Sequence, residues 1–71
     1  MAIDVCIRLG RRLRELRTAK GWNQLYLAEL SGLGHIYISQ LENGRKQACI
    51  RTIDVLAQSF GMSISEFMKG I

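Results

Sequence analysis

The sequence predicts an all-α fold in which residues 1–71 form one compact domain of five short helices. Apolar residues recur at helical spacing in successive short segments, and helix-capping residues and glycines stand between these segments. No segment has the strict alternation of a half-buried strand, and proline is absent. A chain of 71 residues leaves little room for a second core.

The first predicted helix begins after Asp4, which can serve as its N-cap, and ends at Lys20, with Gly21 as the C′ residue. Gly10 lies in its interior, where glycine costs roughly 1 kcal/mol relative to alanine. We therefore expect a close contact with another helix at Gly10. The apolar face is made by leucines at i, i+4 and i+7: Leu9, Leu13 and Leu16.

Residues 24–44 carry the most distinctive pattern, in which two short helices are joined by a tight glycine turn. Asn23 is a good N-cap for a helix over 24–30, and Gly32 can take the left-handed conformation that the turn needs. The next helix is expected at about 34–43. The inward-facing residues of the two helices are Leu27, Ala28, Ile38 and Leu41.

Two further helices are predicted after this stretch, over 50–60 and 64–69. Gly61 closes the first of them. Ser63 and Glu66 form a capping box at the start of the second, with a hydrophobic staple made by Met62 and Phe67.

The charge of the chain is basic, with 10 Lys+Arg against 6 Asp+Glu and a formal net charge of +4. This excess suits a polyanionic partner, although a solvated helix face explains much of the same pattern. The hydrophobic content of 48% is high for so small a chain and suggests self-association. The basic residues gather in the first helix and after the central stretch: Arg8, Arg11, Arg12, Arg14, Arg17, Lys20, Arg45, Lys46 and Arg51.

Several other classes of protein are disfavoured. The chain has no apolar run of about 18 residues and no secretory signal, so we expect a cytoplasmic protein without membrane contact. Cys6 and Cys49 have no metal-ligand spacing, and we expect two reduced thiols, with no metal, cofactor or small-molecule ligand. His35 is the only histidine and has no catalytic partner in the sequence, so we expect no enzyme.

A series of motifs spans residues 9–67. The motifs read Leu-Gly-x-x-Leu-Arg-x-Leu-Arg from residue 9, then Gly21, Gln24, Leu27-Ala28, Ser31-Gly32, Tyr37-Ile38-Ser39, Glu42-x-Gly44, Ile53, Ala57, Gly61 and Ser65-Glu66-Phe67. At this spacing the chain resembles the phage-repressor-like helix-turn-helix proteins of the Cro and Xre type. The resemblance implies a lambda-repressor-like DNA-binding domain whose helix-turn-helix is formed by the second and third helices.

The resemblance makes the third helix the recognition helix in the DNA major groove. It implies that His35, Ile36, Ser39 and Gln40 contact base edges. Gln40 can make a bidentate pair with adenine, and Ile36 can contact a thymine methyl group. The chain departs from the family pattern at Gly34 and Cys49, where relatives usually place a Ser or Thr N-cap, and at Ala48, where they often carry proline.

The resemblance also implies phosphate contacts and one structural ion pair. Asn23 and Gln24 would meet a phosphate at a helix N-terminus, or they would only cap and solvate that helix start. Arg17 and Glu42 would pair between the first and third helices, or stay as two solvated side chains. The remaining phosphate contacts would come from Asn43, Arg45, Lys46 and Arg12.

One recognition helix covers only a few base pairs, so we expect a homodimer on a palindromic site. The apolar residues near the C-terminus are more than five short helices need for one core, which suggests a contact with a second copy. The alternative is that these residues form part of an ordinary core. A second contact surface could lie at Leu25, Tyr26 and Leu30. The expected dimer seam consists of Val55, Phe60, Met62, Phe67, Met68 and Ile71.

The function predicted from these features is that of a sequence-specific, double-stranded DNA-binding transcription regulator acting as a homodimer on a palindromic operator. Phage-type repressors, restriction–modification controllers and autoregulators all fit this description. The alternative is an antitoxin-like or adaptor protein whose main partner is another protein.

Overall fold

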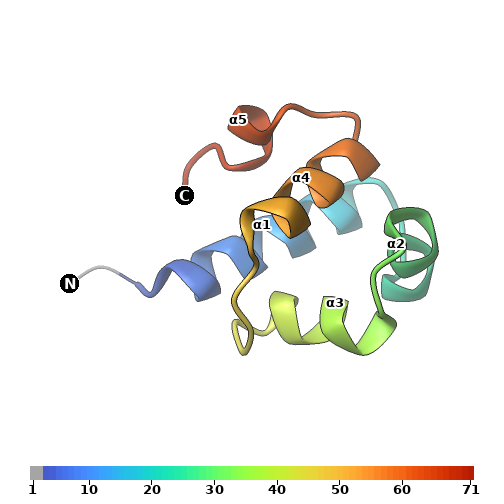
Figure 1. The fold of residues 1–71 in the computed structure, drawn as a ribbon, viewed down its shortest axis with the longest axis horizontal. Helices are drawn as coiled ribbons and strands as arrows, with labels where there is room; N and C mark the ends of the chain where they lie inside the picture. The colour runs from blue at the N-terminus through green and yellow to red at the C-terminus, as the bar shows by residue number, and fades with distance from the viewer. Residues whose placement is uncertain (1–2) are drawn as a thin grey trace.

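The computed structural model describes residues 3–71, and these residues form five helices and no strand (Figure 1). The helix ends lie within two residues of the predicted ones, and the all-α prediction is confirmed. Among residues 3–71 no helix is long and apolar enough to span a membrane. The helices are α1 (Val5–Ala19), α2 (Gln24–Ser31), α3 (His35–Glu42), α4 (Ile50–Ser59) and α5 (Ile64–Phe67).

Local capping explains why the helices begin where they do. Side-chain oxygens of Asp4, Asn23 and Ser63 each accept a backbone N–H in the first turn of α1, α2 and α5, at 2.8, 2.8 and 3.1 Å. The capping box predicted at α5 is present. Gly34 and Cys49 precede α3 and α4 without a side-chain cap, so packing against other helices must hold those two starts.

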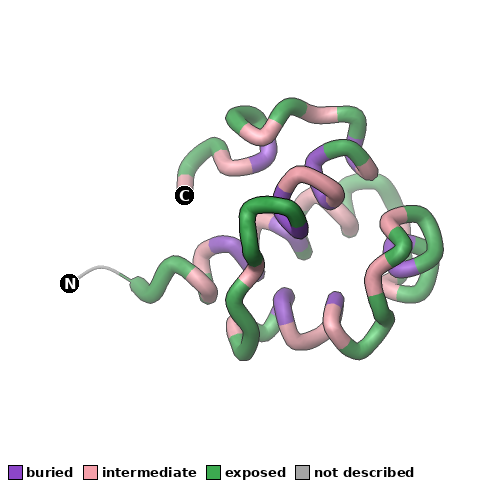
Figure 2. Tube along the Cα trace, in the orientation of Figure 1, coloured by how far each residue is buried: buried purple, intermediate pink, exposed green. Residues whose placement is uncertain are grey.

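The core lies where α1, α2, α3 and α4 meet, and α5 closes it over α4 (Figures 1 and 2). The residues predicted to face inward on α2 and α3 are all buried, as are two of the three leucines of α1. The third, Leu16, packs against the core from its edge. The buried core residues are Leu9, Leu13, Leu27, Ala28, Ile38, Leu41, Ile53, Leu56, Ala57, Phe60 and Phe67.

Gly10 marks a close contact with another helix, as the sequence predicted, and that contact is with the last turn of α3. A Cβ at this position would lie 2.7 Å from the carbonyl oxygen of Glu42 and closer still to that of Leu41. The absence of a side chain therefore lets the backbone of α1 approach the end of α3. This approach fixes the distance between the first and third helices.

The prediction that Phe60 and Phe67 lie in a dimer seam is wrong. The two side chains are only 6% and 0% exposed and belong to the core. Their ring centroids lie 6.2 Å apart, and Trp22 stacks on Phe60 at 5.2 Å. The short α5 needs this aromatic contact to dock on α4, because a helix of four residues is not stable without tertiary packing.

The other four residues of the predicted seam are half-buried. Met62, Met68 and Ile71 pack against the edge of the core, and Val55 lies on α4. The apolar surplus lies elsewhere on the described surface, mainly at the start of α1 and on α2. The exposed large apolar residues are Ile3, Val5, Ile7, Leu25, Tyr26, Leu30, Ile36 and Ile50.

Candidate nucleic-acid interface

The turn between α2 and α3 sets the angle of the helix-turn-helix. Gly32 ends α2 in the left-handed region, with φ +75°, and its N–H donates to the Ala28 carbonyl at 2.9 Å. The Leu33 N–H donates to Ser31 Oγ at 3.2 Å, and the Leu33 side chain packs against the core. A residue with a Cβ would be strained at Gly32, so the turn requires glycine.

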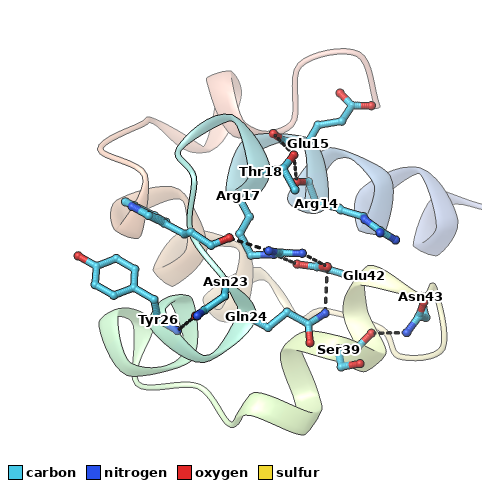
Figure 3. Close-up of polar contacts among 11 residues, drawn as sticks. Arg14, Glu15, Arg17, Thr18, Asn23, Gln24, Tyr26, Ser39, Glu42 and Asn43 are labelled. Atoms are coloured by element: carbon cyan, nitrogen blue, oxygen red, sulfur yellow. Dashed lines mark hydrogen bonds and ion pairs between the residues drawn. The ribbon is translucent and has the colours of Figure 1, made fainter.

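A polar cluster holds the ends of α1 and α3 to the start of α2 (Figure 3). Arg17 donates to Glu42 through two bonds, Nε–Oε2 at 2.6 Å and Nη2–Oε1 at 3.0 Å, and to the Trp22 carbonyl at 2.7 Å. Gln24 Nε2 donates to Glu42 Oε1 at 3.1 Å. The ion pair between Arg17 and Glu42 is therefore present, and it is bidentate.

This cluster is largely buried. The side chains of Arg17 and Glu42 are 11% and 2% exposed, and the hydrogen bond to Glu42 raises the pKa of Arg17 above its ordinary value. Within residues 3–71 no buried side-chain nitrogen or oxygen lacks a hydrogen-bond partner. Removing either member of the pair would leave a charge with little access to water, which is a costly arrangement.

The four predicted base-contact residues lie on the side of α3 that faces away from the core. His35 and Ile36 are exposed, Ile36 at 73%, and Ser39 and Gln40 are half-buried. The opposite side of the helix carries the buried Ile38 and Leu41. The outward side therefore offers an imidazole, an amide, a hydroxyl and one apolar side chain to a ligand that approaches α3.

Polar residues lie at both ends of the helix-turn-helix. Asn23 is exposed at the N-cap of α2, and Gln24 occupies its first turn. Asn43 donates from Nδ2 to the Ser39 carbonyl at 2.9 Å. Arg45 and Lys46 are exposed in the loop over residues 43–49, which follows α3.

That loop is held in place by two hydrogen bonds. The Arg45 N–H donates to the Gln40 carbonyl at 2.9 Å, and the Tyr37 hydroxyl donates to the Gln47 carbonyl at 3.3 Å. Its two basic side chains therefore extend from a backbone that is fixed relative to α3. The sequence gave no signal for this anchoring role of Tyr37.

Arg12 has a different role from the predicted phosphate contact. Its guanidinium donates to the main-chain carbonyls of Glu66 and Phe67, at 2.8 and 3.0 Å, and ties α1 to α5. Arg12 lies roughly 200° around α1 from Gly10, which faces α3. It therefore points away from α3 and does not belong to the candidate interface. Arg8 makes a similar tie by donating to the Ile71 carbonyl.

Both cysteines are free thiols, and the described residues contain no group of three or more His, Cys, Asp and Glu placed to hold a metal ion. Cys49 Sγ lies 3.4 Å from Thr52 Oγ1, and a hydrogen bond from that hydroxyl lowers the pKa of the Cys49 thiol. Partial burial and the nearby Asp4 carboxylate raise the pKa of Cys6.

Comparison with known proteins agrees with this geometry. A sequence model described as "Helix-turn-helix" matches residues 13–67, which is most of the chain. The chain belongs to the helix-turn-helix family. The resemblance to DNA-binding proteins of the Cro type that the motifs indicated is thereby confirmed.

Two similar proteins illustrate the family. The HTH-type transcriptional regulator PuuR of Escherichia coli is 43% identical over 60 residues, which cover 84% of this chain and 32% of PuuR. The chain thus spans about a third of the length of that regulator. The control protein C.MunI from a Mycoplasma species is 29% identical over 69 residues, covering 96% of this chain and 93% of C.MunI.

A solved structure gives the same answer for the fold. The restriction–modification controller protein C.AhdI from Aeromonas hydrophila matches with a TM-score of 0.84 and 40% sequence identity. The match covers 87% of this chain and 94% of that one.

Proposed function

We propose that this chain is a sequence-specific transcription regulator that binds double-stranded DNA as a homodimer on a palindromic operator, and that it works in the cytoplasm. The observation that carries the proposal is the outward side of α3. Four side chains able to read bases lie there, between polar residues at the start of α2 and a basic loop at the end of α3.

The dimensions of α3 suit the major groove. Its eight residues span about 12 Å, so its outward side meets only a few base pairs. Gln40 pairs with adenine through its amide, Ile36 packs against a thymine methyl group, and His35 donates to a guanine acceptor or a phosphate. Ser39 hydrogen-bonds a neighbouring base edge.

Phosphate contacts position α3 in the groove. Asn23 and Gln24 contact a phosphate of the DNA backbone at the start of α2, where the helix dipole and free N–H groups favour an anion. Phosphates at the opposite end of α3 are contacted by Asn43, Arg45 and Lys46. Because one short helix gives little sequence information, two copies bind half-sites about one helical turn apart.

Selection of bound sequences from a random DNA pool tests this proposal. We expect a palindrome with half-site centres about 10 base pairs apart. Gln40→Ala should cost about 1–3 kcal/mol of specific affinity and relax the preference at one base position in each half-site. If Gln40→Ala selects the same sequence with the same affinity as the wild type, the assignment of α3 to base reading is refuted.

Charge variants separate phosphate contacts from general electrostatics. Lys46→Gln should weaken binding evenly across sequences and reduce the salt slope by about one per copy. Arg11→Gln is the matched control, because it removes the same charge from an exposed position of α1 beside Arg8 and Arg12. Equal slopes for the two variants would contradict a specific role of the loop.

A second function is supported by the exposed residues of α2. Leu25, Tyr26 and Leu30 are exposed apolar side chains on the helix preceding α3, and they suit an adaptor or antitoxin-like protein whose main partner is another protein. Tight protein capture combined with weak, sequence-indifferent DNA binding would favour this alternative. Controllers, phage-type repressors and autoregulators are distinguished by the genes that the selected sites control.

A further inference from the structure

The described surface has an apolar face at the start of α1 that the proposed DNA contacts do not use. Two of its eight exposed large apolar side chains, Val5 of α1 and Ile50 of α4, define what we call the α1–α4 face. Ile50 is the more exposed of the two, at 69%, and it opens the first turn of α4.

The start of α1, the 43–49 loop and α4 border one cleft. A Cβ built on Gly44 would lie 2.9 Å from Ile7 Cγ1, which places the 43–49 loop against the start of α1. A cleft of about 240 Å³ lies between α1, this loop, α4 and Met68. Ile50 lies one helical turn before Ile53, a cleft residue, and therefore stands at the rim of the cleft. The cleft is lined by Val5, Cys6, Leu9, Gln47, Ala48, Ile53 and Met68.

The chemistry of the cleft fits a second copy of this chain. None of the residues that line it is charged. A two-fold interface places a surface against its own copy, so a patch with charge of one sign would repel itself. The cleft between α1 and the C-terminal residues fails this requirement, because its four basic lining residues outnumber its single acidic one, Glu15. The basic residues are Arg8, Arg11, Arg12 and Lys69.

The position of the face also fits two copies on one DNA. The start of α1 and the 43–49 loop lie at the same end of the molecule, and α2 lies at the opposite end (Figure 1). The loop leaves the C-terminal end of α3. A two-fold axis beside this face brings the C-terminal ends of two α3 helices toward each other. Their outward sides can then face one duplex.

We propose that the α1–α4 face is the dimer seam, and that Ile50 of each copy enters the cleft of the other. This inference rests on the proposed homodimer and names the surface that forms it. The protruding side chain and the receiving cleft are on the same face, so each contact occurs twice about the axis. The seam thus lies at the start of α1 and α4, away from the buried Phe60 and Phe67.

Directed disulfide formation tests the contact. Ile50→Cys in a Cys49→Ser background places a thiol at the rim, where it reaches Cys6 in the cleft of the second copy. A mild oxidant such as diamide takes two electrons and two protons from this thiol pair and leaves one S–S bond. We expect a covalent dimer on a non-reducing gel, which disappears when Cys6→Ser is added. Leu25→Cys in the same background is the matched control and should stay uncoupled, because Leu25 is a comparably exposed apolar residue on α2.

A second measurement uses no thiol chemistry. Ile50→Glu should raise the dissociation constant of the dimer at least about tenfold in analytical ultracentrifugation, because the seam buries this residue twice. Leu25→Glu should leave it unchanged. The seam is refuted if the wild type is dimeric but Ile50→Glu associates equally well and no disulfide forms, and the proposed function then still stands. A wild type that binds its selected DNA as a single copy would refute the homodimer and the seam with it.

Discussion

Gly10→Ala tests the contact on which the position of α3 depends. The added methyl group would lie 2.7 Å from the Glu42 carbonyl oxygen and closer still to that of Leu41. Both neighbours are backbone atoms, which cannot rotate away as the end of a flexible side chain can. The variant must therefore push α1 and α3 apart, and the nearby Arg17–Glu42 pair would be stretched with them.

Two opposing effects determine the magnitude. Overpacking by one methyl group costs about 1–3 kcal/mol, and the rigid neighbours favour the upper end. Alanine returns about 1 kcal/mol through its better helix propensity. We expect a net loss of about 2 kcal/mol in the free energy of unfolding, which is a large share of the stability of a small domain.

Urea unfolding followed by circular dichroism measures this loss. With a slope near 1 kcal/mol per molar urea, the midpoint should fall by roughly 2 M. Gly34→Ala is the matched control, because its nearest neighbour, Tyr37 Cβ, lies 4.0 Å away. It should cost at most about 1 kcal/mol by removing a favoured N-cap residue. If Gly10→Ala is as stable as the wild type or more stable, helix propensity outweighs the contact and the reasoning is refuted.

Three further predictions concern side chains outside the proposed base-reading set. Glu42→Gln leaves the charge of Arg17 without its partner and should destabilise the fold by about 3 kcal/mol in urea unfolding; a loss below about 1 kcal/mol would contradict a structural pair. Arg12→Gln unties α1 from α5 and should lower stability by roughly 1–3 kcal/mol, with no change in the salt slope of DNA binding; a shallower slope would restore it to the interface. Cys49 should be alkylated faster than Cys6 near pH 8, as followed by peptide mass spectrometry, because its thiol pKa is lowered and that of Cys6 is raised; the reverse order would contradict the assigned hydrogen bond.

The features that the sequence predicted well depend on short-range chemistry. Asp4, Asn23 and Ser63 cap their helices through residues two or three positions away, so the helix starts are local properties. The inward side of each helix follows from its own apolar spacing in the same way. Gly10 was informative because an interior glycine is costly and suggests a contact that requires it.

The predictions that were wrong concern how the helices pack against one another. Phe60 and Phe67 looked like surplus apolar surface because the packing of α5 on α4 cannot be derived from either segment alone. Arg12 looked like one more cation near DNA because charge alone does not say which way a side chain points. Its direction could have been inferred, since Gly10 already marked the side of α1 that meets another helix and Arg12 lies two residues further on.

Glu42 connects the stability of the fold to the proposed DNA contacts. Its carboxylate holds Arg17 of α1 and Gln24 of α2 while it ends α3, so one side chain joins three helices. An amide carries two N–H donors, and Gln24 can keep one on Glu42 while the other meets a phosphate. In the proposed complex, a phosphate that binds at the start of α2 would therefore contact a residue already hydrogen-bonded to the end of α3. The same hydrogen-bonded cluster would then determine both the contact with the DNA backbone and the orientation of the base-reading helix.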